Sequence, residues 1–406
     1  MHDIDFSKVG FSTLAIHAGA YEDKQYGAEA TPIFQTSTYT FEDMDEAEGV
    51  FRGEVPKYAY GRHGNPTTAT LEKKMAALEG AEAAAVTGSG MGAVSSVLLG
   101  LLKCGDHVVA ADTVYGCTDV VIRQFLPTLG IETTQVDTSN LEAVEAAMRP
   151  NTKIVYFEAC ANPTMRVTDI AAVAEIAHKH GAIVVVDNTF TPPPVCQPLK
   201  CGADVVLHSM TKYLNGHGDV IAGVICSDAE TIHTIISRAV GKLTGSELAP
   251  IASYMVIRGL KTLDLRMKAH SANAKAMAEY LEKQPYIKAV YHPSLKSNTK
   301  NYEIGKKQFR EGYCTGMVTF ECAEYKGMSE YEVAKKLLNN LCIPGLGVSL
   351  GGPDSLIQQP ASMTHANVTP EGRKEAGITE GMVRFSVGLE NIEDLIADFE
   401  QSAAKL

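Results

Sequence analysis

Two residues that could do chemistry stand where apolar runs of the chain end. The run Ala-Ile-Val-Val-Val stops at Asp187, and the run Val-Val-Leu-His-Ser-Met-Thr stops at Lys212. Either residue alone is more simply a solvated charge where a strand leaves the core. Together they offer an amine able to form a Schiff base with an aldehyde, and a carboxylate able to keep a pyridine nitrogen protonated. A cofactor that requires both an amine and a carboxylate of this kind is pyridoxal phosphate (PLP).

A phosphate-bearing cofactor also needs a cradle, and a glycine-rich turn offers one. Residues 87–92 read Thr-Gly-Ser-Gly-Met-Gly and lead into an apolar helical run over residues 93–102. The start of a helix presents unpaired N–H groups that suit a phosphate. Ser209 and Thr211, just before Lys212, could add hydroxyl donors.

The same turn also fits a dinucleotide fingerprint, because Gly88, Gly90 and Ala93 follow the G-x-G-x-x-A pattern. Asp106 and Asp112 fall roughly where a ribose-binding acid would lie. A dinucleotide-binding oxidoreductase is therefore an alternative. Two observations count against this alternative. The alanine-rich stretch before the turn predicts a poor strand, and a dinucleotide site would assign no function to Asp187 and Lys212.

The elements that must position these residues alternate up to about residue 230. Short runs rich in Val and Ile are separated by helical segments, of which the first begins at Asn65-Pro66 and ends at Gly80. Runs that are apolar on both faces and linked by helices predict a mostly parallel sheet covered by helices, with ligands beyond the carboxyl ends of its strands. The predicted strands are 107–110, 131–136, 153–158, 182–187, 204–209 and 222–227.

The two ends of the chain have a different texture. The first sixty or so residues are irregular and rich in Gly, Thr and Tyr, which indicates an arm. After about residue 245, longer helices and strand candidates at 317–322 and 382–387 predict a smaller α+β domain. The expected division is an N-terminal arm at 1–62, a large cofactor-binding domain at 63–257 and a C-terminal α+β domain at 258–406.

Composition limits the partners and the compartment. Against 48 Asp+Glu the chain has 36 Lys+Arg, a formal charge of −12, which disfavours nucleic acid and anionic membranes. The longest uncharged run, 83–102, has too many Gly, Ser and Thr for a membrane span and predicts a buried loop and helix. Nine scattered cysteines without a leader segment predict reduced thiols in the cytoplasm, and no spacing predicts a metal site.

Five motifs, in order along the chain, together resemble one family of enzymes. They are Tyr-Gly-Arg-His-Gly-Asn-Pro-Thr at 60–67, Ser-Gly-Met at 89–91, Asp-Asn-Thr at 187–189, His-Ser-Met-Thr-Lys-Tyr at 208–213 and Arg-Phe-Ser-Val-Gly at 384–388. They are similar to the Cys/Met-metabolism, cystathionine γ-synthase-like family of PLP-dependent enzymes. The resemblance implies an α/β, PLP-dependent transferase-like fold of aspartate aminotransferase type I.

The resemblance further implies which residues bind the cofactor. Lys212 would be the Schiff-base lysine, Asp187 the partner of the pyridine nitrogen and Tyr115 the residue that stacks on the ring. Further cofactor contacts implied are Ser89, Gly90, Met91, Ser209 and Thr211 around the phosphate, Glu158, Asn162 at the ring hydroxyl, and Tyr60 and Arg62 at a neighbouring subunit's phosphate. The last two imply a homo-oligomer, with a dimer needed to complete the site and a tetramer expected.

The implied substrate contacts are Ser349, Thr364 and Arg384. Arginine suits the α-carboxylate because its planar fork binds a carboxylate bidentately and stays charged. Without the resemblance, Arg384 could equally be an edge residue paired to a structural acid.

Within the family, the far end of the substrate decides the activity. Members that handle cystathionine are similar in carrying acids where this chain has Ala59 and Val348. An apolar pair cannot compensate a buried ammonium and suits a thioether methyl. Cys117 matches the cysteine that marks methionine γ-lyases, although Gly241-Lys242 stands where Lys-Asp is expected.

We therefore expect α,γ-elimination of the small-molecule substrate L-methionine to methanethiol, 2-oxobutyrate and ammonia, with homocysteine as a further substrate. The expected catalytic residues are Lys212, Tyr115 and Cys117. The Lys212 amine would remove the Cα proton, and Tyr115 would protonate the departing sulfur. That second role predicts a Tyr115 pKa below the free value of about 10, favoured by a neighbour's Arg62.

Three alternatives remain besides the oxidoreductase. The first is O-acetylhomoserine sulfhydrylase, which runs γ-replacement in the same family. The second is a cystathionine γ-lyase or synthase. The third is a cofactor-binding regulator that has lost turnover.

Overall fold

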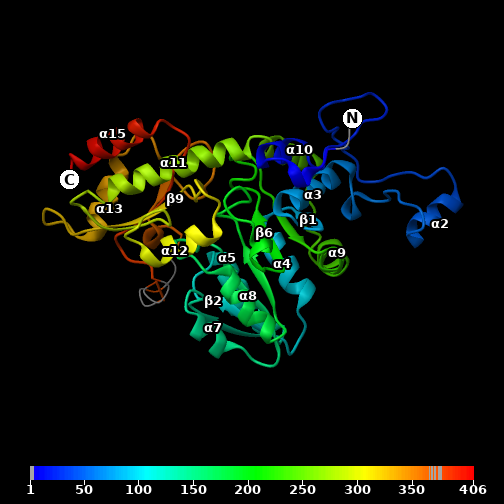
Figure 1. Ribbon diagram of the computed structural model, residues 1–406, viewed down its shortest axis with the longest axis horizontal. Helices are drawn as coiled ribbons and strands as arrows, with labels where there is room; N and C mark the ends of the chain where they lie inside the picture. Colours follow the sequence, from blue (N-terminus) through cyan, green and yellow to red (C-terminus); the bar gives the residue numbers. More distant parts are fainter. Residues whose placement is uncertain (1–3, 365, 367–368, 370–371, 374–376) are drawn as a thin grey trace.

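The computed structural model describes residues 4–364, 366, 369, 372–373 and 377–406. It holds two sheets, joined by the long helix α11 (Leu263–Leu281) that runs across one side of the molecule (Figure 1). In the described part of the chain, no helix is long and apolar enough to cross a membrane.

The larger sheet is mostly parallel, as predicted. Its order is β1-β7-β6-β5-β4-β2-β3, and only β7 runs antiparallel to its neighbours. The central strands are buried on both faces because helices cover each side, so their sequences read as continuous Val-rich runs. The strands are β1 Ala83–Thr87, β2 His107–Ala111, β3 Glu132–Val136, β4 Thr152–Glu158, β5 Ile183–Asp187, β6 Val205–Ser209 and β7 Gly223–Ser227.

The beginning of the 83–102 run was predicted to be a loop and a poor strand. It is instead the strand β1. Ala83–Thr87 pairs along its whole length with β7. Alanine has a low β-propensity, but pairing and burial against a neighbouring strand override a propensity of that size. The glycine-rich turn therefore does follow a strand, and the objection raised on this point against a dinucleotide site was wrong.

Helices around this sheet begin and end at the predicted signals. In α3 (Pro66–Glu79), the Asn65 side chain accepts from Thr67 N at 2.9 Å, and Gly80 ends the helix at φ 73°. The other helices are α4 Gly90–Leu101, α5 Gly116–Val120, η3 Val121–Phe125, α6 Leu126–Thr128, α7 Leu141–Ala147, α8 Ile170–Lys179, η4 Pro198–Cys201, α9 Ala229–Ile235, η5 Ile236–Thr244 and α10 Pro250–Leu260.

The smaller sheet has the order β10-β11-β12-β9-β8 and is mainly antiparallel. Of its strands, β9 was predicted with its bounds, β12 was predicted to end at Val387 instead of Ser386, and β8, β10 and β11 were missed. Its elements are β8 Ile287–Tyr291, α12 Thr299–Gln308, β9 Met317–Cys322, α13 Glu330–Asn340, β10 Gly345–Leu346, β11 Leu356–Gln358, η6 Pro360–Ser362, β12 Met382–Ser386 and α15 Ile392–Ala403.

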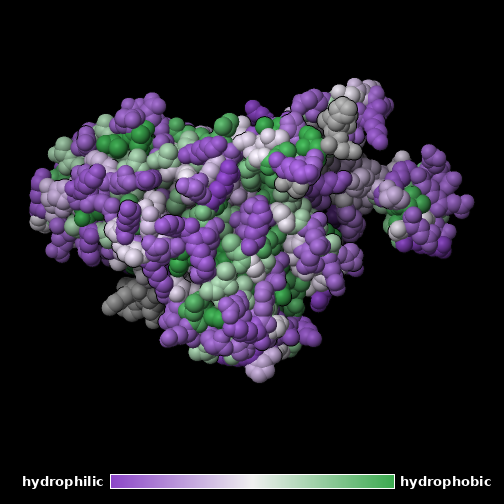
Figure 2. All heavy atoms as spheres, in the orientation of Figure 1, coloured by the Kyte–Doolittle hydropathy of each residue, from purple (hydrophilic) through white to green (hydrophobic). Residues whose placement is uncertain are grey.

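The N-terminal residues divide into a docked part and a projecting part. Helix α1 (Phe11–His17), which follows the short turn η1 (Phe6–Lys8), packs on α3 and α11. The chain then leaves the body, and α2 (Met44–Arg52) forms a separate lobe (Figures 1 and 2) before the turn η2 (Gly61–His63) returns. On α2, Met44 is 80% and Phe51 79% exposed. The boundaries at residues 62 and 257 stay predictions.

Candidate active site

Three neighbouring strands of the large sheet end in polar residues. Glu158 ends β4, Asp187 ends β5 and Ser209 ends β6, and Glu158 is the register partner of Asp187. The carboxyl ends of parallel strands meet at one edge of the sheet, which is where ligands of such sheets bind. This edge gathers the side chains that follow.

Lys212 lies just beyond this edge. The turn after β6 is closed by a hydrogen bond from Lys212 N to Ser209 O at 3.2 Å, and the side chain crosses toward the C-terminal region, where Nζ donates to Ser349 Oγ at 2.9 Å. Burial, with the nearby charge of Arg384, lowers the pKa of Lys212 to about 8. A fraction of this lysine is therefore a neutral amine near neutral pH.

Arg384 lies on β12, in the middle of the smaller sheet, and is 6% exposed. Nη1 donates to Asn162 Oδ1 at 3.1 Å and Nη2 donates to the backbone oxygen of Ser349 at 3.0 Å. Burial lowers its pKa to about 10, so it stays charged at neutral pH. Its partners here are neutral oxygens, which excludes the alternative of a structural acid pair.

Gln358, which no sequence motif singled out, supports this arginine. Gln358 on β11 is the register partner of Arg384, and its amide oxygen, in the orientation that suits its surroundings, accepts from Arg384 Nε at 3.0 Å. Ser349, whose backbone accepts on the other side, has a φ of 89°, in the left-handed region that costs a non-glycine residue roughly 1–3 kcal/mol. The glutamine could have been found only by pairing β11 with β12.

Glu158 holds two backbone segments of the site, and its expected contact with the cofactor stays a prediction. Its Oε1 accepts from Tyr115 N at 2.6 Å and its Oε2 accepts from Asn162 N at 2.9 Å. Both oxygens thus hold the backbones of the two residues expected to touch the ring. Burial, together with the charge of Asp187, raises the pKa of Glu158 to about 8. In this structure Glu158 positions Tyr115 and Asn162.

Among the described residues, Asp187 is held through one of its carboxylate oxygens. Its Oδ1 accepts from Thr189 N at 3.0 Å and from Thr189 Oγ1 at 2.6 Å, while Thr189 Oγ1 in turn accepts from Ser209 N at 2.9 Å. Burial raises the pKa of Asp187. A desolvated carboxylate beside Glu158 is stabilised by a cation, and a protonated pyridine nitrogen supplies one. Thr189 is a further supporting residue, which the Asp-Asn-Thr motif contained.

The predicted phosphate cradle is built around the start of α4. Ser89 is its N-cap and its hydroxyl accepts from Gly92 N at 2.9 Å, so Ser89 shapes the turn and leaves the amides of Gly90 and Met91 at the helix start. A Cβ on Gly90 would lie 2.7 Å from the Cβ of Ser209, so only glycine lets Ser209 approach. The Thr211 hydroxyl accepts from Ala222 N at 3.1 Å, which ties it to the backbone.

Tyr115 and Cys117 lie together at the entrance of α5. Tyr115 is 46% exposed, and its hydroxyl shares a hydrogen bond with the Cys117 thiol. That bond, reinforced by partial burial, raises the pKa of Tyr115 to about 12, while the charge of Arg384 opposes the rise. The predicted lowering of this pKa is wrong for the chain by itself, because the thiol contact and burial outweigh the one nearby cation.

Arg62 contacts both Tyr60 and Gly241, the residue that departs from the family pattern. The Arg62 guanidinium lies 5.6 Å from the centre of the Tyr60 ring, and Nη1 donates to the Gly241 carbonyl. A Cβ on Gly241 would come within 3.2 Å of Ile236 O and 3.3 Å of His63 Nδ1. A side chain at 241 would therefore require these neighbours to move by a few tenths of an ångström. The contact of Tyr60 and Arg62 with a neighbouring subunit stays a prediction.

Thr364 is exposed on the segment that follows η6, and its role in substrate binding stays a prediction. Among the residues that the structure describes, no group of three His, Cys, Asp or Glu side chains could hold a metal ion. His208, next to Ser209, contacts Glu79 inside the core.

The arrangement defines a class. An amine of lowered pKa, a desolvated acid, a helix start that can take an anion and a buried arginine together fit an enzyme that binds PLP and an amino acid. The glycine that lets Ser209 close the cradle, and the raised pKa of Asp187, fit the phosphate and the ring nitrogen respectively.

Comparison with known proteins gives the family. Residues 12–404 match the model of the Cys/Met metabolism PLP-dependent enzymes, so the chain belongs to that family and PLP is its cofactor. It is 50% identical over 403 residues to an L-methionine gamma-lyase of Porphyromonas gingivalis, with 99% of each chain covered. It is 48% identical to an L-methionine gamma-lyase of Fusobacterium nucleatum subsp. polymorphum, covering 99% of this chain and 100% of the relative.

A solved structure agrees in fold. The putative O-acetylhomoserine (thiol)-lyase metY of Campylobacter jejuni, which carries a pyridoxyl-lysine-5′-monophosphate, superposes with a TM-score of 0.91 at 32% identity. The match covers 98% of this chain and 100% of that one. The type I fold implied by the motifs is thereby confirmed, and the dinucleotide-binding alternative is excluded by the family.

Proposed function

We propose that the protein catalyses the PLP-dependent α,γ-elimination of L-methionine, a carbon–sulfur lyase reaction that yields methanethiol, 2-oxobutyrate and ammonia. Homocysteine is proposed as a second substrate. The observation that carries the proposal is that Tyr115, with Cys117 beside it, and Lys212 both lie within electrostatic reach of Arg384. It is supported by full-length relatives at 43% to 50% identity that are methionine gamma-lyases.

The substrate's ends are accounted for by different parts of the chain. The charged guanidinium of Arg384, held in place by Asn162 and Ser349, suits the α-carboxylate. For the far end, Val348 is 56% exposed and Ala59 is partly exposed. Neither can pair with a distal ammonium, whereas both tolerate a methyl group. This favours methionine over cystathionine.

When bound, PLP supplies an aldehyde that takes up the substrate's amino group and a ring that accepts the electrons released at Cα. Lys212 then acts as a base at Cα. Its pKa of about 8 makes the neutral amine accessible, and the Ser349 hydroxyl holds Nζ in place. Asp187 provides the negative charge that keeps the ring nitrogen protonated.

Tyr115 is proposed to protonate the departing sulfur. In the chain by itself its pKa is raised to about 12, which keeps the phenol protonated at neutral pH but makes it a weak acid, so this role needs the further cation expected from a neighbouring subunit's Arg62 to lower the pKa. Cys117 orients the hydroxyl through the hydrogen bond between them. Glu158 fixes the backbone of Tyr115 beneath it.

The protein is further proposed to work in the cytoplasm as a homo-oligomer. A dimer would complete the active site, and the whole assembly would be a tetramer. The projecting lobe with exposed Met44 and Phe51 supports this, because so much apolar side chain on a protruding element favours contact with another subunit. Tyr60 and Arg62 at its base would reach a neighbour's phosphate. The division into an arm at 1–62 and domains at 63–257 and 258–406 is likewise proposed, from the change in sequence texture along the chain.

One experiment tests the activity. The purified holoenzyme is incubated in parallel with methionine, homocysteine, cystathionine and O-acetylhomoserine, and oxo acid and volatile thiol are measured. We expect methanethiol and 2-oxobutyrate in equal amounts from methionine alone. If O-acetylhomoserine reacts only with an added thiol and methionine is inert, the protein is a sulfhydrylase. If cystathionine is the best substrate, the assignment of Ala59 and Val348 is wrong.

A further inference from the structure

A buried arginine lies on α11, outside the set of residues predicted to bind cofactor or substrate. Arg266 is 7% exposed. Its guanidinium donates from Nη1 to Tyr213 O at 2.6 Å, from Nη2 to Gly259 O at 2.9 Å and from Nε to Thr262 Oγ1 at 3.2 Å. These acceptors are neutral, and Gly259 lies in the last turn of α10, where the helix dipole favours a cation. Burial lowers the pKa of Arg266 to about 10, so the group remains charged at neutral pH.

Arg266 holds the turn that carries Lys212. The carbonyls of Tyr213 and Leu214 accept from its two terminal nitrogens, and the carbonyl of Lys212 accepts from Gly216 N at 2.7 Å. The turn closes tightly against the guanidinium, because a Cβ on Gly216 would lie 1.9 Å from Arg266 Nη1. Three consecutive carbonyls, beginning at the lysine itself, are therefore fixed by one arginine and one backbone amide.

Other backbone segments pack against the same turn. A Cβ on Gly351 would lie 2.7 Å from Tyr213 N and 3.1 Å from the Lys212 carbonyl carbon. At the end of α10, a Cβ on Gly259 would lie 2.2 Å from Asn215 O. Glycine at both places allows this close approach of backbone to backbone. The backbone of the turn is thus confined, and the Lys212 side chain is the part left to move.

The same face of α11 also reaches the strand of the substrate-binding arginine. His270 follows Arg266 by one helical turn, and its ring packs edge-on against Tyr213 with the ring centres 5.1 Å apart. His270 Nδ1 donates to Val387 O at 2.9 Å, directly after β12, which carries Arg384. One helix therefore fixes the lysine turn relative to the arginine strand.

We propose that Arg266 is a positioning residue of the elimination. It holds the backbone of residues 212–216 so that only the Lys212 side chain moves between the cofactor aldehyde and the substrate's Cα. This inference rests on the proposed function, in which Lys212 is the base. Arginine suits the position because its planar fork reaches the end of α10 and the lysine turn at once, whereas the single ammonium of a lysine does not.

The test compares two variants of the holoenzyme. Arg266→Lys keeps the charge but loses the fork, and Arg266→Met loses both. We expect kcat for methionine elimination to fall about tenfold in the first and about 10²-fold in the second, because a displacement of the base by about 1 Å has an effect of this size. KM should stay within about twofold, since Arg384 still binds the α-carboxylate.

A second readout does not depend on turnover. Backbone hydrogen exchange of the holoenzyme reports on the bond from Gly216 N to the Lys212 carbonyl. Exchange over residues 213–216 should become faster in both variants, while exchange over β12 should stay as in the wild type. Equally faster exchange in β12 would mean general destabilisation and would overturn the positioning role.

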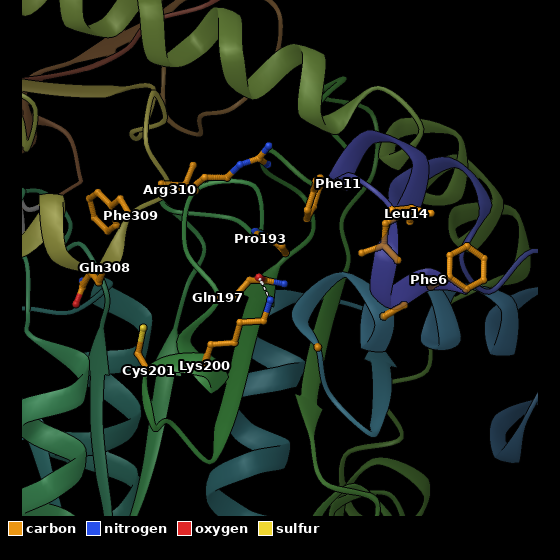
Figure 3. Close-up of a pocket in the computed structure, with 14 residues that line it drawn as sticks. Phe6, Phe11, Leu14, Pro193, Gln197, Lys200, Cys201, Gln308, Phe309 and Arg310 are labelled. Carbon is orange, nitrogen blue, oxygen red and sulfur yellow. Dashed lines mark hydrogen bonds between the residues drawn. The ribbon is translucent and has the colours of Figure 1, made fainter. Parts of the chain in front are cut away.

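Arg310 supplies the matched control. It lines a separate cavity of about 610 Å³ (Figure 3), and its Nη1 lies 3.6 Å from Asp264 Oδ1. None of residues 212–216 lines that cavity, so Arg310→Lys should change neither kcat nor exchange in the turn. Wild-type kcat and exchange in Arg266→Met overturn the proposal, and wild-type kcat in Arg266→Lys overturns the need for the fork. A wild-type protein that leaves methionine unchanged refutes the proposed function instead, and the exchange readout still tests the hold on the turn.

Discussion

Two lysines in different regions of this molecule each have a pKa lowered to about 8, chiefly by desolvation. Lys74 of α3 is 1% exposed, and its Nζ donates to the carbonyls of Ala15 at 2.9 Å and Ile16 at 3.1 Å near the end of α1. Lys212 is partly exposed, and a single hydroxyl, that of Ser349, accepts from its Nζ.

The comparison of Lys74 with Lys212 shows what a lowered pKa indicates and what it does not. Desolvation acts on both amines alike, so the shift alone cannot separate a reactive lysine from a structural one. Lys74 uses its hydrogens to fix the docked part of the arm against helix carbonyls, where a cation is favoured. Lys212 keeps hydrogens uncommitted, faces an accessible site and has Arg384 nearby. Partners and access, rather than acidity, distinguish them.

The largest expected effect comes from removing the reactive lysine. Lys212→Ala should lower the rate of methionine elimination by about 10⁴-fold, the upper end for the loss of a positioned base. Lys74→Met should leave that rate within about twofold. Thiol release by both purified variants is the measurement. Comparable losses of rate in the two, with PLP bound in each, would remove the distinction drawn between them.

A smaller loss is expected at the proposed acid. Tyr115→Phe should slow thiol release by about 10²-fold, because the proton donor is lost while the ring remains. Cys117→Ser, which keeps a hydrogen-bonding group beside the phenol, is the milder companion change and should lose less. Wild-type release of methanethiol by Tyr115→Phe would exclude the phenol as the acid.

The rate of methionine elimination should rise with pH by at most about tenfold per pH unit below the pKa of Lys212. Because Lys212 is a free amine only once the substrate has taken its place on PLP, a base with a pKa of about 8 gives kcat values that rise with pH up to that region and then level off. Arg384→Lys should weaken methionine binding, seen as a raised KM, without moving this limb to higher pH. A rate that is flat from pH 6 to 9 would contradict the assignment of Lys212 as the titrating base.

The smallest effect is on folding stability. Lys74→Met leaves the buried carbonyl of Ala15 and the part-buried carbonyl of Ile16 without their donor, and should lower the free energy of unfolding by about 1–3 kcal/mol. Since the folded pKa of Lys74 lies below its unfolded value, the unfolded chain binds the extra proton between pH 8 and 10, and wild-type stability gains from Lys74 as pH rises through this window. Denaturant midpoints of both proteins at pH 7.5 and 9.5 measure this, and an equal pH dependence in the two would refute it.

Much of the fold could be predicted because its signals are local. Valine-rich runs fixed the six predicted strands of the large sheet to within a residue or two, and Asn65-Pro66 with Gly80 fixed α3. Strand β1 could not be predicted in this way. Its alanines have no strand preference of their own, and only pairing with β7 makes them a strand.

Which reactive groups meet could be predicted from the order of residues, because Asp187, Lys212 and the glycine turn lie at strand ends and parallel strands bring their ends to one edge. How those groups behave depends on the folded arrangement. It turned Glu158 onto two backbone amides, set Gln358 beside Arg384, and raised the pKa of Tyr115 through the thiol of Cys117. The reason is physical, because desolvation and long-range hydrogen bonds depend on distances that a linear pattern does not contain.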